Sequence, residues 1–148
     1  MIGKIIAEKY QLLRKIENAN LRELYLALGI NTNKQHMIRV CSKSYMLYLD
    51  HFSKVLRTME VSNSGIIQIE DVIEDEETYY IVYEYAQGMT FNEVIDEYGV
   101  QSEEDVIQWA RDIAYTLQYI HGLNPPIIFS NLNPRNIYLQ PSGEIKLV

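Results

Sequence analysis

The stretch "IIFSNLNPRNIYL", residues 127–139, decides the fold of this chain. Its apolar ends predict two short strands, and its polar centre, with three asparagines and Pro134, predicts a tight loop between them. A second apolar segment, "EIKLV" (144–148), follows the turn "PSG" (141–143). We therefore expect a polar loop followed by a β-hairpin.

Composition excludes several classes of function. The chain has 148 residues, 47% of them apolar, which is enough for the core of a domain of common size. The net charge of −7 and the lack of a basic stripe argue against nucleic-acid binding. No apolar run approaches the about 18 residues that cross a bilayer, and the start of the chain is too charged and short for a signal peptide. A single cysteine, Cys41, excludes an internal disulfide, so we expect a cytoplasmic protein with no membrane or nucleic-acid partner.

The first part of the chain is expected to form an antiparallel sheet. Runs of β-branched and aromatic residues predict strands at 10–17, 22–30, 36–42, 66–74 and 78–85. The last two flank the acidic turn "DEE" and predict a hairpin. Short turns join most neighbouring strands, which favours antiparallel pairing in an α+β domain.

Three helices are predicted between and after these strands. Apolar residues recur every three or four positions from Tyr45 to Met59, which predicts an amphipathic helix. Thr90 and Glu93 have the spacing of a capping box and predict a short helix through about Tyr98. The longest helix is predicted from Ser102 to Gly122, with three acids in its first turn.

Four strings within this order resemble the first half of a eukaryotic-type protein kinase of the bacterial serine/threonine kind. They are "LRELYLA" (21–27), "HMIRVCSK" (36–43), "YYIVYEYAQG" (79–88) and "IIFSNLNPRNIYLQPSGEIKLV" (127–148). The resemblance covers essentially the whole chain. It implies an N-terminal lobe at 1–86, with an antiparallel sheet and one helix. It also implies a partial C-terminal lobe at 87–148, which holds the first helices and the catalytic-loop hairpin and ends before the D-F-G position, so the kinase domain is expected to be truncated.

By this resemblance the catalytic loop has lost its base. Phe129, Ser130 and Asn131 stand at the positions of the family's His, Arg and Asp. The aspartate accepts the proton of the substrate hydroxyl, which an amide does not, and losing a positioned base costs roughly 10²–10⁴ in rate. Asn133 replaces the lysine of this loop, and Asn136, the family's second magnesium ligand, is retained.

The groups that hold a nucleotide in the family are also replaced. Aligned on Leu24, the three glycine positions of the phosphate-binding loop hold Glu17, Ala19 and Arg22. By this resemblance, Glu17 places a negative charge at a position where the family has a glycine, whose backbone can approach a phosphate closely.

The lysine position and its surroundings have changed as well. Arg39 stands where the family has the lysine that pairs with phosphates, and a planar guanidinium is not equivalent to an ammonium. Its glutamate partner is missing, because Asp50 and Glu60 lie near the ends of the predicted helix rather than at its middle. Met37 replaces the small residue above the adenine.

Simpler interpretations exist for the residues that still match. Glu84 and Ala86 occupy the hinge positions whose backbone groups hold adenine, but any residue supplies those groups. Asn136 without a neighbouring carboxylate is expected to hold its turn by hydrogen bonds rather than a metal. Arg39 is expected to form a salt bridge with a nearby acid. The three histidines show no ligand spacing. We expect no catalytic residue, cofactor or metal.

These observations predict a pseudokinase, which is a kinase-like module without catalysis that binds or regulates a protein partner. The expected partner is another kinase domain or a second copy of this chain, because a partial lobe leaves apolar surface exposed. The alternative is an ATP-binding atypical serine/threonine kinase or a nucleotide-dependent switch that uses Arg39, Asn136, ATP and magnesium. A degenerate or truncated product whose remaining half lies elsewhere is the third interpretation.

Overall fold

The computed structural model describes residues 1–16, 23–44, 55 and 57–148, and it divides into two compact units. The first unit comprises Met1–Glu60 and Gln68–Tyr85, and the second comprises Val61–Ile67 and Ala86–Val148. We describe each unit by itself. The expected boundary after residue 86 stays a prediction, and the segment Val61–Ile67 groups with the second unit.

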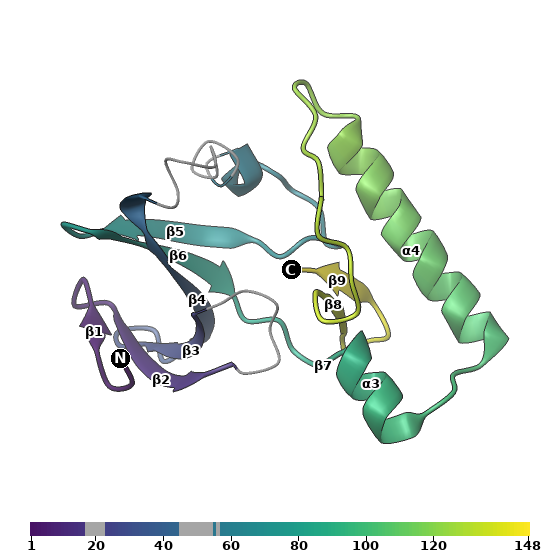
Figure 1. Ribbon diagram of the computed structural model, residues 1–148, viewed down its shortest axis with the longest axis horizontal. Coiled ribbons are helices and arrows are strands. Elements are labelled where there is room, and N and C mark those ends of the chain that lie inside the picture. Colours follow the sequence, from purple (N-terminus) through teal and green to yellow (C-terminus); the bar gives the residue numbers. More distant parts are fainter. Residues whose placement is uncertain (17–22, 45–54, 56) are drawn as a thin grey trace. The chain divides into compact units, whose positions relative to one another are not determined.

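The first unit is built on a six-stranded sheet with the order β1-β2-β3-β4-β6-β5 (Figure 1). The strands are β1 (Ile5–Ile6), β2 (Tyr10–Lys15), β3 (Leu24–Gly29), β4 (Gln35–Ser42), β5 (Ile69–Glu74) and β6 (Thr78–Glu84). Every neighbouring pair is antiparallel, as predicted. The predicted strand at 66–74 is a partial error, because β5 begins only at Ile69.

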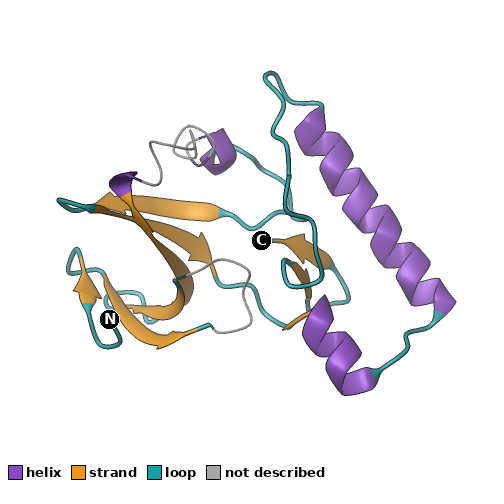
Figure 2. Ribbon diagram, in the orientation of Figure 1, coloured by secondary structure: helices purple, strands orange, loops and turns teal. Residues whose placement is uncertain are grey.

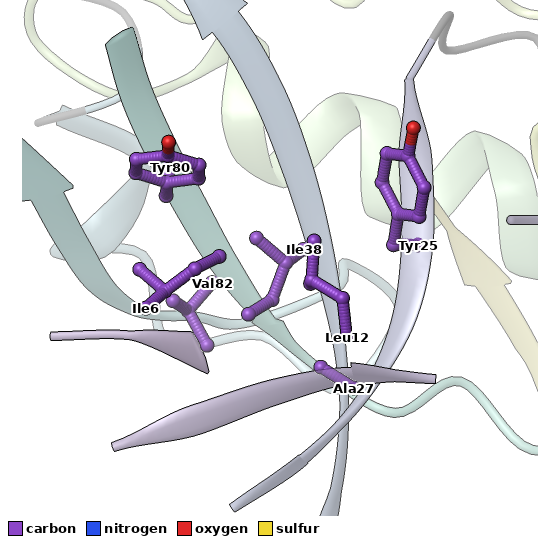
Figure 3. Packing of buried hydrophobic residues seen from close by; sticks show 7 residues of the cluster. All are labelled: Ile6, Leu12, Tyr25, Ala27, Ile38, Tyr80 and Val82. Atoms are coloured by element: carbon purple, nitrogen blue, oxygen red, sulfur yellow. The ribbon is translucent and has the colours of Figure 1, made fainter. Parts of the chain in front are cut away.

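One face of this sheet carries the core of the first unit. Seven side chains from five strands pack together, as Figure 3 shows: Ile6, Leu12, Tyr25, Ala27, Ile38, Tyr80 and Val82. Alternate residues of each strand face this core because side chains in a strand alternate between the two faces. The hydroxyl of Tyr80 lies at the edge of this core. It accepts a hydrogen bond from Lys4 Nζ at 2.6 Å and donates one to Asp75 Oδ2 at 2.7 Å.

The helix predicted from Tyr45 to Met59 lies largely outside the described residues. Of its positions, the structure describes residue 55 and residues 57–59, and all of these are helical. Val55 is buried. The predicted helix is therefore confirmed only at its C-terminal end.

The second unit combines a three-stranded sheet with two helices (Figure 2). The strands, in the order β7-β8-β9, are β7 (Met89–Thr90), β8 (Ile137–Leu139) and β9 (Ile145–Leu147), and the helices are α3 (Phe91–Tyr98) and α4 (Glu103–His121). The predicted terminal hairpin is confirmed, and β7 adds a third strand to it. Thr90 caps α3 with both bonds of the predicted capping box, and Ser102 caps α4.

Residues 66 and 67, directly before β5, pair with β9 of the second unit and not with the sheet of the first unit. Ile66 forms a parallel bridge with Leu147 of β9, and the backbone N–H of Ile67 donates to the Leu147 carbonyl at 2.8 Å. Ile66 and Leu147 are buried with Ile120 of α4 in the core of the second unit.

No helix among the described residues is long and apolar enough to span a membrane.

Candidate functional site

The loop between α4 and β8 is held by its own asparagines. The buried side chain of Asn136 donates from Nδ2 to the backbone carbonyl of Asn131 at 2.8 Å. The backbone N–H of Asn136 donates to the Asn133 carbonyl at 3.0 Å, and Asn133 Oδ1 accepts from the N–H of Arg135 at 2.9 Å. These bonds fix the turn directly before β8, which agrees with the interpretation of Asn136 as a residue that holds its turn.

The side chain at the position of the family's base is an exposed amide. Asn131 Oδ1 accepts a hydrogen bond from Asn133 Nδ2 at 3.0 Å, and Asn133 Nδ2 also lies 3.1 Å from the Asn131 carbonyl. A carboxamide oxygen accepts hydrogen bonds but does not take up a proton near neutral pH. The geometry of this loop therefore supplies a fixed turn with an amide, and not a carboxylate, at this position.

The residue at the histidine position contributes to packing. Phe129 packs against the buried cluster of the second unit that contains Ile120, and the neighbouring Ser130 is exposed. An aromatic ring there fills space in the core and offers neither a proton donor nor an acceptor.

The loop does not fit a magnesium ion. Residues 127–139 contain no aspartate or glutamate, and the only charged side chain among them is that of Arg135. Magnesium in proteins relies on one or two carboxylates in addition to phosphate and water, so neutral amides alone are poor ligands. Across the described ranges of the chain, no three His, Cys, Asp or Glu side chains gather as a metal site.

In the first unit, Arg39 lies on the sheet face opposite the seven-residue core. It pairs with Leu24 of β3 and with Ile81 of β6. Tyr83 comes two residues after Ile81, so its side chain points to the same face as that of Arg39. Burial raises the pKa of Tyr83 to about 12, although the positive charge of Arg39 acts in the opposite direction. The phenol of Tyr83 therefore stays neutral near neutral pH despite the positive charge of Arg39.

The salt bridge expected for Arg39 does not occur within the described part of the chain. None of the ion pairs there includes Arg39, and its buried Nε has no hydrogen-bond partner among the described atoms. Glu60 is exposed, while Asp50 lies outside the described residues. The sequence did not single out Tyr83, because its proximity to Arg39 depends on the pairing of β4 with β6.

The remaining predicted positions are described only in part. Met37 is 1% exposed, so its side chain is buried. At the hinge, the N–H of Glu84 donates to the Gln68 carbonyl at 3.0 Å, and Ala86 is buried. Glu17, Ala19 and Arg22, at the expected glycine positions, lie outside the described residues.

The structure brings together the asparagines of the loop but does not relate them to Arg39. Asn131, Asn133 and Asn136 belong to the second unit, and Arg39 belongs to the first. Each group is therefore described within its own unit.

Comparison with known proteins agrees with this description. Residues 10–148 match the model of the protein kinase domain family, so the chain belongs to the protein kinase family. It is 28% identical to the serine/threonine-protein kinase PrkC of Bacillus subtilis over 151 aligned residues, which cover 99% of this chain and 23% of that protein. It is 26% identical to the probable serine/threonine-protein kinase PknB of Lactococcus lactis, with 99% and 24% covered. The chain thus spans about a quarter of the length of these relatives.

Proposed function

We propose that this chain is a catalytically inactive, kinase-like module that works by binding a protein partner. The observation that carries the proposal is the amide of Asn131 at the position of the catalytic base, bonded to Asn133. The loop is held by hydrogen bonds of its own asparagines, whereas the acid that accepts the proton in the family is replaced. One such loss lowers the rate by roughly 10²–10⁴.

The surroundings of Arg39 support the same conclusion. In the family the equivalent lysine pairs with a glutamate and with phosphates, whereas Arg39 lies on the same face as the buried Tyr83 and is in no ion pair among the described residues. Phosphoryl transfer depends on positioned charges that act together, so the replaced lysine and the replaced base reinforce each other's effect. We expect no meaningful phosphoryl transfer.

The proposed partner is a protein, either another kinase domain or a second copy of this chain, in the cytoplasm. Neither a nucleic acid nor a membrane suits a chain with a net charge of −7. Sedimentation of the purified chain, alone and with a kinase domain of one of its relatives, tests this part of the proposal. Association that depends on concentration supports it. A chain that stays monomeric, both alone and with the kinase domain, counts against it.

The alternative function is that of an ATP-binding atypical serine/threonine kinase or a nucleotide-dependent switch. It is favoured by Asn136, which is retained and buried, by the positive charge kept on β4 at Arg39, and by the relatives, which are named as kinases. Thermal unfolding with increasing ATP and magnesium separates the two functions, because a ligand that binds the native state raises its melting temperature. Saturable stabilisation that Arg39→Gln removes supports the alternative, and an unchanged melting temperature supports the inactive module.

A further inference from the structure

An apolar groove runs between the two helices of the second unit. Its volume is about 560 Å³, within the range of roughly 300–1,000 Å³ that is usual for binding pockets. The main side chains that line it are Phe91, Val94 and Ile95 from α3 and Val106, Trp109 and Ile113 from α4. The rings of Phe91 and Trp109 lie 5.0 Å apart and form part of its wall.

The apolar side chains of this groove reach the surface. Ile95 is 53% exposed, Val106 is 49% exposed, and Val100 in the loop between the helices is fully exposed. An apolar groove of this kind, open along one side, is typical of a surface that binds a partner.

Acidic side chains lie on the same two helices as the groove, at positions outside its lining. Between residues 91 and 113 the sequence has seven acids, Glu93, Asp96, Glu97, Glu103, Glu104, Asp105 and Asp112, against one base, Arg111, which leaves an excess of six negative charges. Within the described part of the chain, none of Asp96, Glu97 and Glu103 lies in an ion pair. The negative charge of these three side chains is therefore not neutralised by a described basic side chain, and it favours a positively charged ligand nearby.

We propose that this groove binds one cationic amphipathic helix of a partner protein. The apolar stripe of that helix would lie between α3 and α4, as in other cases where a helix occupies a groove, and its Lys and Arg side chains would face the acids. A second copy of this chain fits less well, because pairing two such grooves would bring the same negative charges together. The inference rests on the proposed function only in taking the partner to be a protein.

The test uses the full chain and three synthetic peptides of 18 residues. The first has leucines at helical spacing and lysines elsewhere, the second has glutamate in place of each lysine, and the third has the composition of the first in shuffled order. Trp109 is the only tryptophan of the chain and lines the groove, so its fluorescence reports binding directly. We expect saturable binding of the first peptide, weakened by added salt, and binding at least tenfold weaker for the other two.

Two neighbouring positions of α4 provide matched variants. Val106 and Ile107 are 49% and 43% exposed, but only Val106 lines the groove. Val106→Asp is expected to weaken binding of the lysine peptide at least tenfold, and Ile107→Asp is expected to change it less than twofold. Ile95→Asp repeats the test from α3, and circular dichroism confirms that each variant is folded.

Several outcomes would overturn the inference. Equal binding of the lysine and glutamate peptides, or equal loss in the Val106 and Ile107 variants, removes its basis. A dimer of the chain that Val106→Asp dissociates would assign the groove to a second copy, and binding of an apolar dye that the lysine peptide does not displace would assign it to a small molecule. Phosphoryl transfer is measured independently, so a failure of peptide binding leaves the proposed inactivity intact, and a catalytic chain leaves the groove intact.

Discussion

Asn136 donates its side-chain N–H to the backbone carbonyl of Asn131, with 2.8 Å between the nitrogen and the oxygen. The donor is 3% exposed, whereas the side chain of Asn131 is exposed. One asparagine therefore holds the loop from inside while the other presents an amide to solvent. The shape of the loop and the chemistry at its surface depend on different residues.

This difference predicts unequal effects of two alanine substitutions. Asn136→Ala removes a buried donor and is expected to lower the free energy of unfolding by about 1–3 kcal/mol. Asn131→Ala changes an exposed side chain and is expected to cost less than about 0.5 kcal/mol. Urea denaturation followed by circular dichroism measures both values, and equal losses would show that Asn136 does not hold the loop.

Gly88 lies close to the end of β8, and we expect any side chain at this position to destabilise the protein. Its φ is +97°, and a Cβ atom there would lie 2.0 Å from the backbone carbonyl oxygen of Leu139. Gly143 has a similar φ of +88° but open space around it. Gly143→Ala is expected to cost about 1–2 kcal/mol for the backbone conformation alone. Gly88→Ala is expected to cost more than Gly143→Ala when both are compared by thermal unfolding, and a smaller loss at Gly88 would contradict the close approach.

The buried hydroxyl of Tyr83 predicts a loss of stability at alkaline pH. Burial raises its pKa from 10.0 to about 12 in the folded state. Between these values the unfolded chain releases a proton that the folded chain keeps, so the free energy of unfolding falls by about 1.4 kcal/mol per pH unit. The contribution is fully present below pH 10 and is lost as the pH rises toward 12.

Tyr83→Phe is the control for this prediction. The variant has no phenol to ionise at this site, so its stability is expected to fall less steeply over the same range of pH. Urea denaturation at a series of pH values measures both slopes. Identical slopes for the two proteins would mean that Tyr83 ionises as it does in the unfolded chain.

The cap of α3 predicts a specific dependence on a hydroxyl group. Thr90 Oγ1 accepts from the N–H of Glu93 at 3.2 Å, and the Glu93 carboxylate accepts from the N–H of Thr90 at 2.8 Å. Thr90→Ala is expected to lower the free energy of unfolding by about 0.5–2 kcal/mol, while Thr90→Ser keeps the hydroxyl and most of the stability. If both variants lose the same amount in urea, the loss comes from the methyl group and not from the cap.

Much of the fold follows from local sequence patterns. Alternating apolar residues predicted β2 to β6, and the capping box at Thr90 and the helical period after Ser102 predicted α3 and α4. The two-residue strands β1 and β7 were not predicted, because two residues carry no period. The bridge of Ile66 to Leu147 joins residues far apart in the chain, so the pattern around Ile66 indicated a strand without showing its partner.

The candidate site was likewise predictable only where its residues are neighbours in the sequence. The loop containing Asn131 was found from its motif, because those residues are adjacent in sequence. The position of Tyr83 on the same sheet face as Arg39 and the groove beside Trp109 depend on strand pairing and on the packing of α3 against α4, which no single segment encodes.

Transfer of radiolabelled phosphate from the γ position of ATP tests the central claim most directly. The purified chain is incubated with magnesium and with a general acceptor protein, and label is counted on both proteins. With an amide at Asn131 and no ion pair of Arg39 among the described residues, no label above the protein-free background is expected. Label that appears on either protein and disappears in Asn131→Ala or Arg39→Gln would contradict it.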